Sequence, residues 1–246
     1  MVGKADDLGV TRDTLWAGSL VFWQPARGAG YRFNLDAILL AGFVRPARHI
    51  VDLGAGCGIV GTLLLAESKA NQVTGVEIQS QLVDLAERNA QENGFRGRLV
   101  THAGDLRSVE LPANADAVVF NPPYFRVGEG RSAPDPGREI ARRERHGTLE
   151  DFIRYGLQCL SHGGSLYCIV RTDRLEEVTT HVARHGGSVL RSRWIHARSH
   201  SSPRHVLVEA GRGRSGVWHR MPPLVVHDRQ GYTGEVRGLL REPALT

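Results

Sequence analysis

The segment between residues 49 and 121 constrains the fold most, because short apolar runs alternate there with stretches of helical periodicity. Apolar residues follow helical spacing in two of these stretches, at 59–67 and 80–94. Four runs have the length and composition of buried strands, at 49–53, 72–77, 98–102 and 116–120. Strands that alternate with helices in this order predict an α/β fold, with a parallel sheet covered by helices on both faces.

The rest of the chain extends this pattern into a single domain over residues 1–246. Residues 126–147 carry glycine, proline and charge without an apolar face, so we expect a long loop or mobile arm there. Within the domain we distinguish an N-terminal extension and helix in 1–45, the core in 46–210 and a C-terminal segment in 211–246. The further elements expected are a helix at 148–160 with Thr148 as N-cap, a turn SHGG before a fifth strand at 165–170, a helix at 174–187, an antiparallel edge pair at 188–197 and 204–210, a strand at 223–228 and an amphipathic turn near 236–240.

Length and composition exclude several classes of protein. The 246 residues suffice for one α/β domain with a full core and are few for two. The chain has no run of 18 apolar residues and no basic-then-apolar signal pattern at its N-terminus, so we expect a cytoplasmic protein without membrane contact. Three cysteines without CxxC spacing favour buried thiols over a disulfide framework or a zinc ribbon. The 11 histidines show no metal-ligand spacing, and we expect no metal.

A glycine-rich turn, VDLGAGCG, follows the first predicted strand. Gly54, Gly56 and Gly58 stand between a strand and a helix, where open α/β sheets bind nucleotides. Asp52 precedes the first glycine by two positions, and its carboxylate would repel a pyrophosphate. No GK[ST] follows to hold a phosphate either. The turn therefore favours a nucleoside whose tail carries an ammonium group.

Two more acids stand at the ends of the next predicted strands. Glu77 ends the second strand, where a carboxylate accepts hydrogen bonds from both ribose hydroxyls. Asp105 follows the third strand and could contact an adenine amino group. Any one of these acids could instead cap a loop. Three acids at successive strand ends beside a glycine turn predict a site for S-adenosyl-L-methionine, with S-adenosyl-L-homocysteine as the product.

The fourth predicted strand ends in the sequence NPPY. Pro122 and Pro123 cannot continue a central strand, because neither has an N–H to donate. They would form a stiff turn that holds the Asn121 amide and the Pro122 carbonyl as two acceptors for a planar amino group. Tyr124 offers a face on which a base can stack. Taken alone, the motif could also be a plain Asn-Pro turn.

DLGAGCG, Glu77 and NPPY together resemble the class I methyltransferases that modify exocyclic or amide nitrogens. This resemblance implies a Rossmann-like, doubly wound, seven-stranded sheet of order 3-2-1-4-5-7-6 with the seventh strand antiparallel. Over about residues 20–242, the chain is similar to the bacterial valine-tRNA adenine-N6 methyltransferases. The segments that carry this likeness are YRFNLDAILLAGF (31–43), NPPYFRVGEG (121–130), SPRHVLVEAGRG (202–213) and PLVVHDRQGYTGEV (223–236).

The resemblance implies two groups of site residues. Asp36 is matched by the family's acid in the helix before the first strand, but it could equally be an acid of the first helical turn after an Asn34 cap. Cys57 departs from the family, in which small polar residues are more usual at this position. We expect its thiol to contribute to packing rather than to chemistry. At the target base the resemblance implies Asn121, Pro122, Pro123 and Tyr124. The cofactor residues expected are Phe33, Asp36, Asp52, Gly54, Ala55, Gly56, Gly58, Glu77, Ile78, Asp105, Leu106 and Asn121.

Arginine clusters near the expected site suggest an RNA-binding rim. The net charge is +5, and nearly all basic residues are arginines, which grip phosphate in a bidentate fork. A GC-rich genome would also favour arginine, and charged loops are often merely solvated. Segment 191–205 combines arginines and histidines with Trp194 and contains no acid. The RNA-binding candidates are Arg126, Arg138, Arg142, Arg143, Arg193 and Arg204.

We therefore expect an S-adenosylmethionine-dependent N-methyltransferase that acts on N6 of an adenine in tRNA. The expected substrate is valine tRNA, and the expected adenine lies beside its anticodon. The chain would act as a monomer or weak homodimer. A glutamine-N5 methyltransferase of the release-factor type is one alternative, because NPPY serves both reactions. Those enzymes usually have an additional helical domain at the N-terminus, for which only some 45 residues are available here. A guanine-N2 or small-molecule acceptor and a non-catalytic RNA-binding module are further alternatives.

Overall fold

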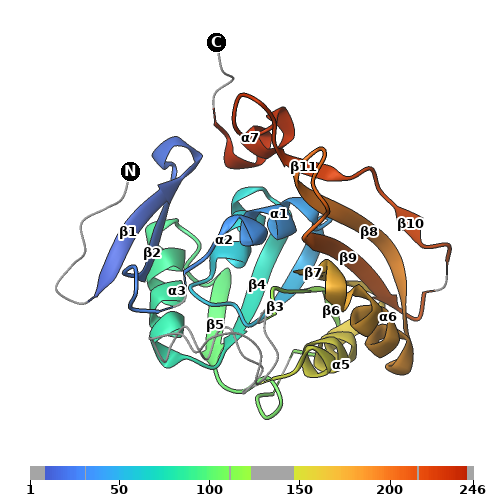
Figure 1. Cartoon of the computed structure of the whole chain (residues 1–246). Coiled ribbons are helices and arrows are strands. Elements are labelled where there is room, and N and C mark those ends of the chain that lie inside the picture. Colours follow the sequence, from blue (N-terminus) through green and yellow to red (C-terminus); the bar gives the residue numbers. More distant parts are fainter. Residues whose placement is uncertain (1–8, 31, 111, 123–146, 215, 243–246) are drawn as a thin grey trace.

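A central sheet with helices on both faces dominates the structure, a computed structural model that describes residues 9–30, 32–110, 112–122, 147–214 and 216–242 (Figure 1). Neighbouring strands follow the order β10-β8-β9-β7-β6-β3-β4-β5, and β11 also pairs with β8. The strands are β3 (Ala47–Leu53), β4 (Ala70–Glu77), β5 (Leu99–Ala103), β6 (Ala115–Phe120), β7 (Leu160–Arg171), β8 (Gly187–Arg198), β9 (His205–Arg212), β10 (His219–Arg220) and β11 (Leu224–His227).

The sheet confirms the strand order implied by the resemblance. If β3 is counted as the first strand, β5-β4-β3-β6-β7-β9-β8 is the order 3-2-1-4-5-7-6. The strands from β5 to β7 run parallel, whereas β9 is antiparallel to both of its neighbours, β7 and β8. The carboxyl ends of the parallel strands therefore meet at one edge of the sheet, which we call the carboxyl edge.

The helices begin and end close to where the sequence predicts them. Thr148 and Asp151 form a reciprocal capping box at the start of α5. Gly94, just beyond α3, has a φ of +73°, which explains why that helix stops there. None of the described helices is both long and apolar enough to cross a bilayer. The helices are α1 (Leu35–Phe43), α2 (Ile59–Ala66), α3 (Ser80–Glu92), α5 (Leu149–Cys159), α6 (Leu175–Arg184) and α7 (Gly234–Leu240), with 3-10 turns η1 (Trp16–Gly18) and η3 (Thr172–Arg174).

The core consists of two layers, one on each face of the sheet. Consecutive strand residues alternate between them, so Ile50 lies in the layer with α1 and α2, whereas Val51 lies in the layer with α5 and α6. The same alternation separates Val119 from Phe120 on β6. Both faces of the central strands are thus covered, as in parallel sheets generally. The doubly wound prediction is confirmed.

The N-terminal part contains structure that the sequence analysis does not predict. Strands β1 (Val10–Leu15) and β2 (Leu20–Pro25) form an antiparallel hairpin outside the main sheet. The hairpin lies beside α3, at the left of Figure 1. Residues along β2 alternate between buried and half-buried, with Phe22 fully buried. The residue types do not show this alternation, because LVFWQP begins with four consecutive apolar residues, and a short apolar run does not by itself distinguish a strand with one covered face.

Two further expectations are corrected by the sheet. The SHGG sequence is not a turn before the fifth strand but an irregularity inside β7, where the partner of Ala115 is Leu160 and the partner of Ala117 is Ser165. Strand β8 does not form the sheet edge along its whole length, because β10 and β11 pair with it on the side away from β9. The C-terminal segment thereby becomes part of the main sheet, which has nine strands in the described part of the chain rather than the seven expected.

Candidate functional site

The carboxyl edge brings the glycine turn and the start of the NPPY motif together. Leu53, the last residue of β3, pairs with Phe120, the last residue of β6. Gly54 and Asn121 therefore leave adjacent strands side by side. Asn121 is half-buried and Pro122 is buried. Pro123 and Tyr124 lie outside the described residues.

Each glycine of the turn needs the conformation that only glycine adopts easily. Gly54, Gly56 and Gly58 have φ values of +72°, +57° and +78°. A Cβ atom on Gly54 would also stand 3.3 Å from the Phe152 ring. The N–H groups of Gly54 and Ala55 both donate to the carbonyl of Val76, at 2.8 and 3.0 Å. The turn is therefore folded back tightly against the end of β4.

Two buried acids stand beneath this turn. Asp52 is 2% exposed, and its Oδ2 has no hydrogen-bond partner within the described part of the chain. Glu77 is 6% exposed and accepts hydrogen bonds from the backbone N–H groups of Gly56, at 2.9 Å, and Gln79, at 3.0 Å. Burial, and then the negative charge of Glu77, raise the pKa of Asp52 to about 7. Burial also raises the pKa of Glu77.

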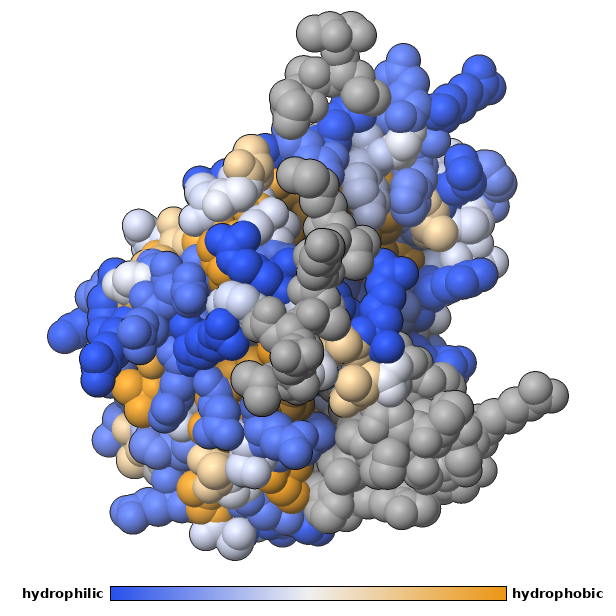
Figure 2. Space-filling model, turned by 90° about the vertical axis from the view of Figure 1, so that its left-hand side faces the viewer, coloured by the Kyte–Doolittle hydropathy of each residue, from blue (hydrophilic) through white to orange (hydrophobic). Residues whose placement is uncertain are grey.

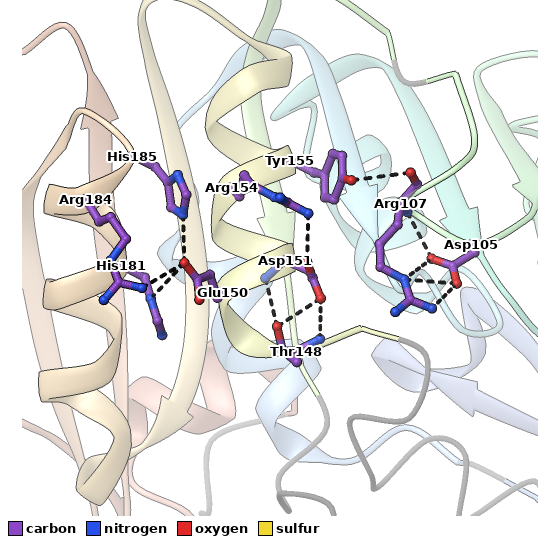
Figure 3. Close-up of polar contacts among 10 residues, drawn as sticks. All are labelled: Asp105, Arg107, Thr148, Glu150, Asp151, Arg154, Tyr155, His181, Arg184 and His185. Carbon is purple, nitrogen blue, oxygen red and sulfur yellow. Dashed lines mark hydrogen bonds and ion pairs between the residues drawn. The ribbon is translucent and has the colours of Figure 1, made fainter.

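The third acid lies beside a partner of its own. Both carboxylate oxygens of Asp105 accept from the guanidinium of Arg107, with Nε at 2.9 Å from Oδ1 (Figure 3). The Tyr155 hydroxyl donates to the carbonyl of Arg107 at 3.3 Å, so this loop is tied to α5. Leu106, which stands between Asp105 and Arg107 in the sequence, is 5% exposed and packs in the core layer below α5.

The start of α5 is fixed by contacts on both of its sides. The capping box of Thr148 and Asp151 holds its first turn. Glu150 accepts from Arg184, the last residue of α6, at 2.9 Å and lies 3.2 Å from Nε2 of His185 directly after that helix (Figure 3). These contacts secure the polypeptide where the described chain resumes beside the carboxyl edge.

The segment before α1 reaches the same edge from the other layer. The Asn34 side chain accepts from the backbone N–H of Asp36 and donates to its carboxylate, so the Asn34 cap weighed in the sequence analysis is present. The Asp36 carboxylate also lies 4.0 Å from His205 at the start of β9. Phe33 packs edge-on against Phe22 with ring centroids 5.4 Å apart, next to the cluster of Cys57, Leu82 and Leu85. Ile78 is half-buried directly after β4.

The predicted RNA-binding arginines fall into three groups. Arg193 makes two contacts with the Glu235 carboxylate, at 2.5 and 2.8 Å, and donates from Nε to the Pro222 carbonyl. Its guanidinium is thus held by the protein itself. Arg204 is exposed and lies just before β9, at the carboxyl edge. Arg126, Arg138, Arg142 and Arg143 lie outside the described residues.

Two asparagines of α3 hold the hairpin against that helix, a role that sequence reasoning missed. Asn89 receives a hydrogen bond from the Trp23 N–H, at 2.6 Å, and donates to the Trp23 carbonyl, at 2.9 Å. Asn93 makes the matching pair with Val21, at 2.9 and 2.7 Å. The two amides thereby occupy the outer edge of β2 as a neighbouring strand would. A polar residue on the apolar face of α3, such as the fully buried Asn89, was the available signal.

The surface of the hairpin side is mostly hydrophilic, with apolar side chains scattered singly (Figure 2). On that side the Arg88 guanidinium lies over the Trp23 ring, 3.3 Å from its centroid. This contact and the two asparagine pairs hold the hairpin against α3.

The arrangement fits a cationic nucleoside. A buried carboxylate oxygen without a partner among the described residues is costly unless a ligand supplies a donor or a positive charge. The Oδ2 atom of Asp52 is such an oxygen, and it lies directly below a turn whose glycines let a ligand approach the backbone. The amide of Asn121 stands at the neighbouring strand end. Together these residues can hold a ligand and present an amide oxygen to a second molecule.

Comparison with known proteins groups the chain with methyltransferases. The model of the methyltransferase small domain family matches residues 35–183. A tRNA1(Val) (adenine(37)-N6)-methyltransferase of Porphyromonas gingivalis is 28% identical over 233 residues, 89% of this chain and 90% of that protein. A protein of the same name from Tolumonas auensis is 30% identical over 166 residues, 66% of this chain and 68% of that protein.

Solved structures share the fold. The crystal structure of a predicted O-methyltransferase from Agrobacterium tumefaciens has a TM-score of 0.67 and 26% identity, and covers 84% of this chain and 96% of its own. M. jannaschii TYW2 in complex with AdoMet has a TM-score of 0.57 at 16% identity, over 86% of this chain and 89% of its own, a likeness that concerns the fold alone.

Proposed function

Because the chain belongs to the methyltransferase small domain family, we propose that it transfers a methyl group from S-adenosylmethionine to N6 of an adenine in tRNA. The observation that carries the proposal is similarity over nearly the whole chain to proteins named tRNA1(Val) (adenine(37)-N6)-methyltransferase. Valine tRNA, with an adenine beside the anticodon, is the substrate that this name suggests.

The cofactor would bind along the carboxyl edge, and the positions of Asp52, the glycine turn and Glu77 at this edge support that proposal. When bound, S-adenosylmethionine supplies a methyl group on a positively charged sulfur. Asp52 offers its buried oxygen to the positive end of the ligand, and Glu77 stands where ribose hydroxyls would find an acceptor. Gly54, Ala55, Gly56 and Gly58 allow close approach to the backbone. The remaining proposed cofactor residues are Phe33, Asp36, Ile78, Asp105, Leu106 and Asn121.

The proposed catalytic work of the chain is positioning. The side-chain oxygen of Asn121 and the carbonyl of Pro122 would accept the two N–H groups of an adenine amino group and fix its orientation. Pro122 and Pro123 would limit the freedom of this backbone, and Tyr124 would stack on the base. Support comes from the register of Leu53 with Phe120, which puts Asn121 beside the glycine turn.

We also propose that residues 1–246 act as one domain, in agreement with how the ends are attached. Val236 of α7 is fully buried in the same core layer as α1, and β11 pairs with β8. Phe22 of the hairpin is buried in that layer as well. Removal of the hairpin or of α7 would thus expose residues of this core layer to water.

The experiment is methylation of an unmodified valine-tRNA transcript by the purified chain, with nucleoside mass spectrometry as the readout. N6-methyladenosine is expected in this transcript and not in a matched one in which the adenine beside the anticodon is replaced by guanine. Methylated glutamine in a release-factor substrate, with unmethylated tRNA, would overturn the proposal in favour of a protein N5-methyltransferase. N2-methylguanosine in the transcript would overturn the choice of adenine.

A further inference from the structure

The outer edge of the main sheet carries an arginine framed by two tryptophans. The Arg220 guanidinium carbon on β10 lies 5.5 Å from the centroid of the Trp194 ring and 5.3 Å from that of Trp218. Trp218 is itself anchored, because its Nε1 donates to Ser192 Oγ at 2.7 Å. Both rings are half-buried and Arg220 is exposed. The rings thus hold a cation at the surface in a defined place.

Arg220 differs from Arg191 and Arg193 of β8 in having no acidic partner among the described residues. Arg191 is paired with the buried Glu209, at 2.7 Å, and Arg193 with Glu235. Within the described ranges no carboxylate lies within 4.0 Å of Arg220. A guanidinium that is stacked but not neutralised keeps its donor fork available for an anion.

The surroundings of Arg220 are positive as well. The segments 187–205 and 216–222 contain five arginines and four histidines and no acidic residue. After the pairs of Arg191 and Arg193 are set aside, Arg198, Arg204 and Arg220 remain, and all three are exposed. A surface with this imbalance attracts a polyanion.

The sheet register places Arg220 level with the proposed active site. Phe120 pairs with Cys168, Cys168 with Val208, Val208 with Ser192, and Ser192 with Arg220. Phe120 immediately precedes Asn121, so one transverse row of the sheet connects the two places. Four strand spacings of about 4.8 Å put Arg220 about 19 Å away. Trp194, Arg198 and Arg204 follow from that row toward the carboxyl edge.

We propose that Arg220, framed by Trp194 and Trp218, binds a backbone phosphate of the RNA substrate, remote from the base that is methylated. This inference rests on the proposed function and adds an RNA contact on β10 to it. The fork of the guanidinium would take two phosphate oxygens, while the exposed parts of the indole rings offer a stacking face to a neighbouring base. RNA is preferred over an acidic protein because the contact lies level with the site that would receive the adenine.

The experiment measures binding of the valine-tRNA transcript to the full chain by fluorescence anisotropy, from about 50 to about 200 mM salt. Arg220→Ala should raise Kd about 3- to 10-fold and lower the slope of log Kd against log salt by about 0.9. Arg220→Lys should restore the slope but only part of the affinity, because lysine has no fork. The cofactor Kd and the melting temperature should stay at the wild-type values.

Arg241→Ala is the matched control. Arg241 is also exposed and stacked, 3.6 Å from the centroid of the Trp16 ring, but it lies after α7, in the layer of α1. Its removal takes away the same charge and should leave Kd within about twofold.

An unchanged salt slope in Arg220→Ala, or an equal loss in Arg241→Ala, would overturn the phosphate site. A shift of oligomeric state in Arg220→Ala, with unchanged RNA affinity, would assign the surface to a second copy instead. If the wild-type chain neither binds nor methylates the transcript, the proposed function fails first, which distinguishes the two failures.

Discussion

Asn89 on α3 donates a hydrogen bond from Nδ2 to the carbonyl of Cys57, 2.8 Å away, inside the glycine turn. The same amide group also bonds to the N–H and the carbonyl of Trp23 on the hairpin. One fully buried side chain thereby joins three parts of the chain: the helix that follows β4, the N-terminal hairpin and the turn below which Asp52 lies. Such a residue couples the packing of the hairpin to the shape of the site.

Asn89→Ala is expected to weaken cofactor binding about tenfold, because the Cys57 carbonyl loses its donor and the turn loses its support. It should also lower the free energy of unfolding by about 2 kcal/mol. Calorimetric titration with S-adenosylmethionine, well below the melting temperature, measures the first effect, and urea unfolding the second.

Asn93→Ala is the control for this prediction. Asn93 bonds to Val21 in the same way and donates to the Asn89 carbonyl, but no contact of its side chain with the glycine turn is present in the described structure. This variant should lose stability and keep cofactor affinity within about twofold. An equal loss of affinity in both variants would show that Asn89 acts only through the hairpin.

Asp52 predicts a pH dependence of stability. Its folded-state pKa of about 7 lies above the value of about 3.9 for an exposed aspartate. The protonated form is therefore favoured by folding, so this contribution to stability is full below about pH 4 and is lost as the pH rises through 7. Asp52→Asn stays neutral, and between about pH 5 and 8 its unfolding free energy should gain more than about 1 kcal/mol relative to wild type. Parallel pH profiles from the two proteins would contradict this.

The same carboxyl group predicts a proton linkage in cofactor binding. A positively charged ligand favours the carboxylate, so binding near pH 6.5 should release a proton and affinity should rise with pH up to about 7. Calorimetry in buffers of different ionisation enthalpy measures the proton count. The release should disappear in Asp52→Asn. A wild-type titration without buffer dependence would exclude Asp52 as the ligand's partner.

Asn121→Ala is expected to abolish methyl transfer and to leave the cofactor Kd within a few fold. The reason is that its amide oxygen would orient the target nitrogen, whereas Asp52 and Glu77 would hold the ligand. Single-turnover transfer to tRNA and calorimetric titration separate the two quantities. Retained transfer would refute the positioning role, and lost cofactor binding would move Asn121 to the ligand.

Arg204→Ala is expected to weaken tRNA binding more than Arg193→Ala does. Arg204 is exposed at the carboxyl edge, whereas the Arg193 guanidinium is occupied by Glu235 and the Pro222 carbonyl. Arg193→Ala should instead destabilise the fold by about 1 kcal/mol, as should Glu235→Ala. Anisotropy and urea unfolding, applied to all three variants, distinguish these effects. A larger affinity loss for Arg193→Ala would reverse the assignment.

The sequence allowed the sheet to be predicted where local pattern and long-range pairing agree. HIVDL and DAVVF are apolar runs with the length of buried strands, and they became β3 and β6 side by side in the sheet. Thr148 predicted the start of α5 because an N-cap is a purely local signal, and in the structure Asp151 completes the capping box. The insertion of β9 between β7 and β8 came from the family resemblance rather than from the pattern itself.

The hairpin and its attachment could not be predicted in this way. The strand β2 is a short apolar run, and its outer partner is two side chains of a helix, Asn89 and Asn93, rather than another strand. No strand pattern reports such a partner. Likewise, Arg193 and its partner Glu235 are 42 positions apart in the sequence. The run of arginines alone therefore could not show which guanidinium is paired within the protein and which is available to bind RNA.

The attachment of the hairpin also has a consequence for synthesis. Val21 and Asn93 are 72 positions apart, so β2 leaves the ribosome long before the helix that completes its hydrogen bonds. During that interval the nascent hairpin has an unpaired outer edge that other strands can join. Newly made chains are thus most exposed to misassembly before α3 emerges, and a binding chaperone would be of most use to them then.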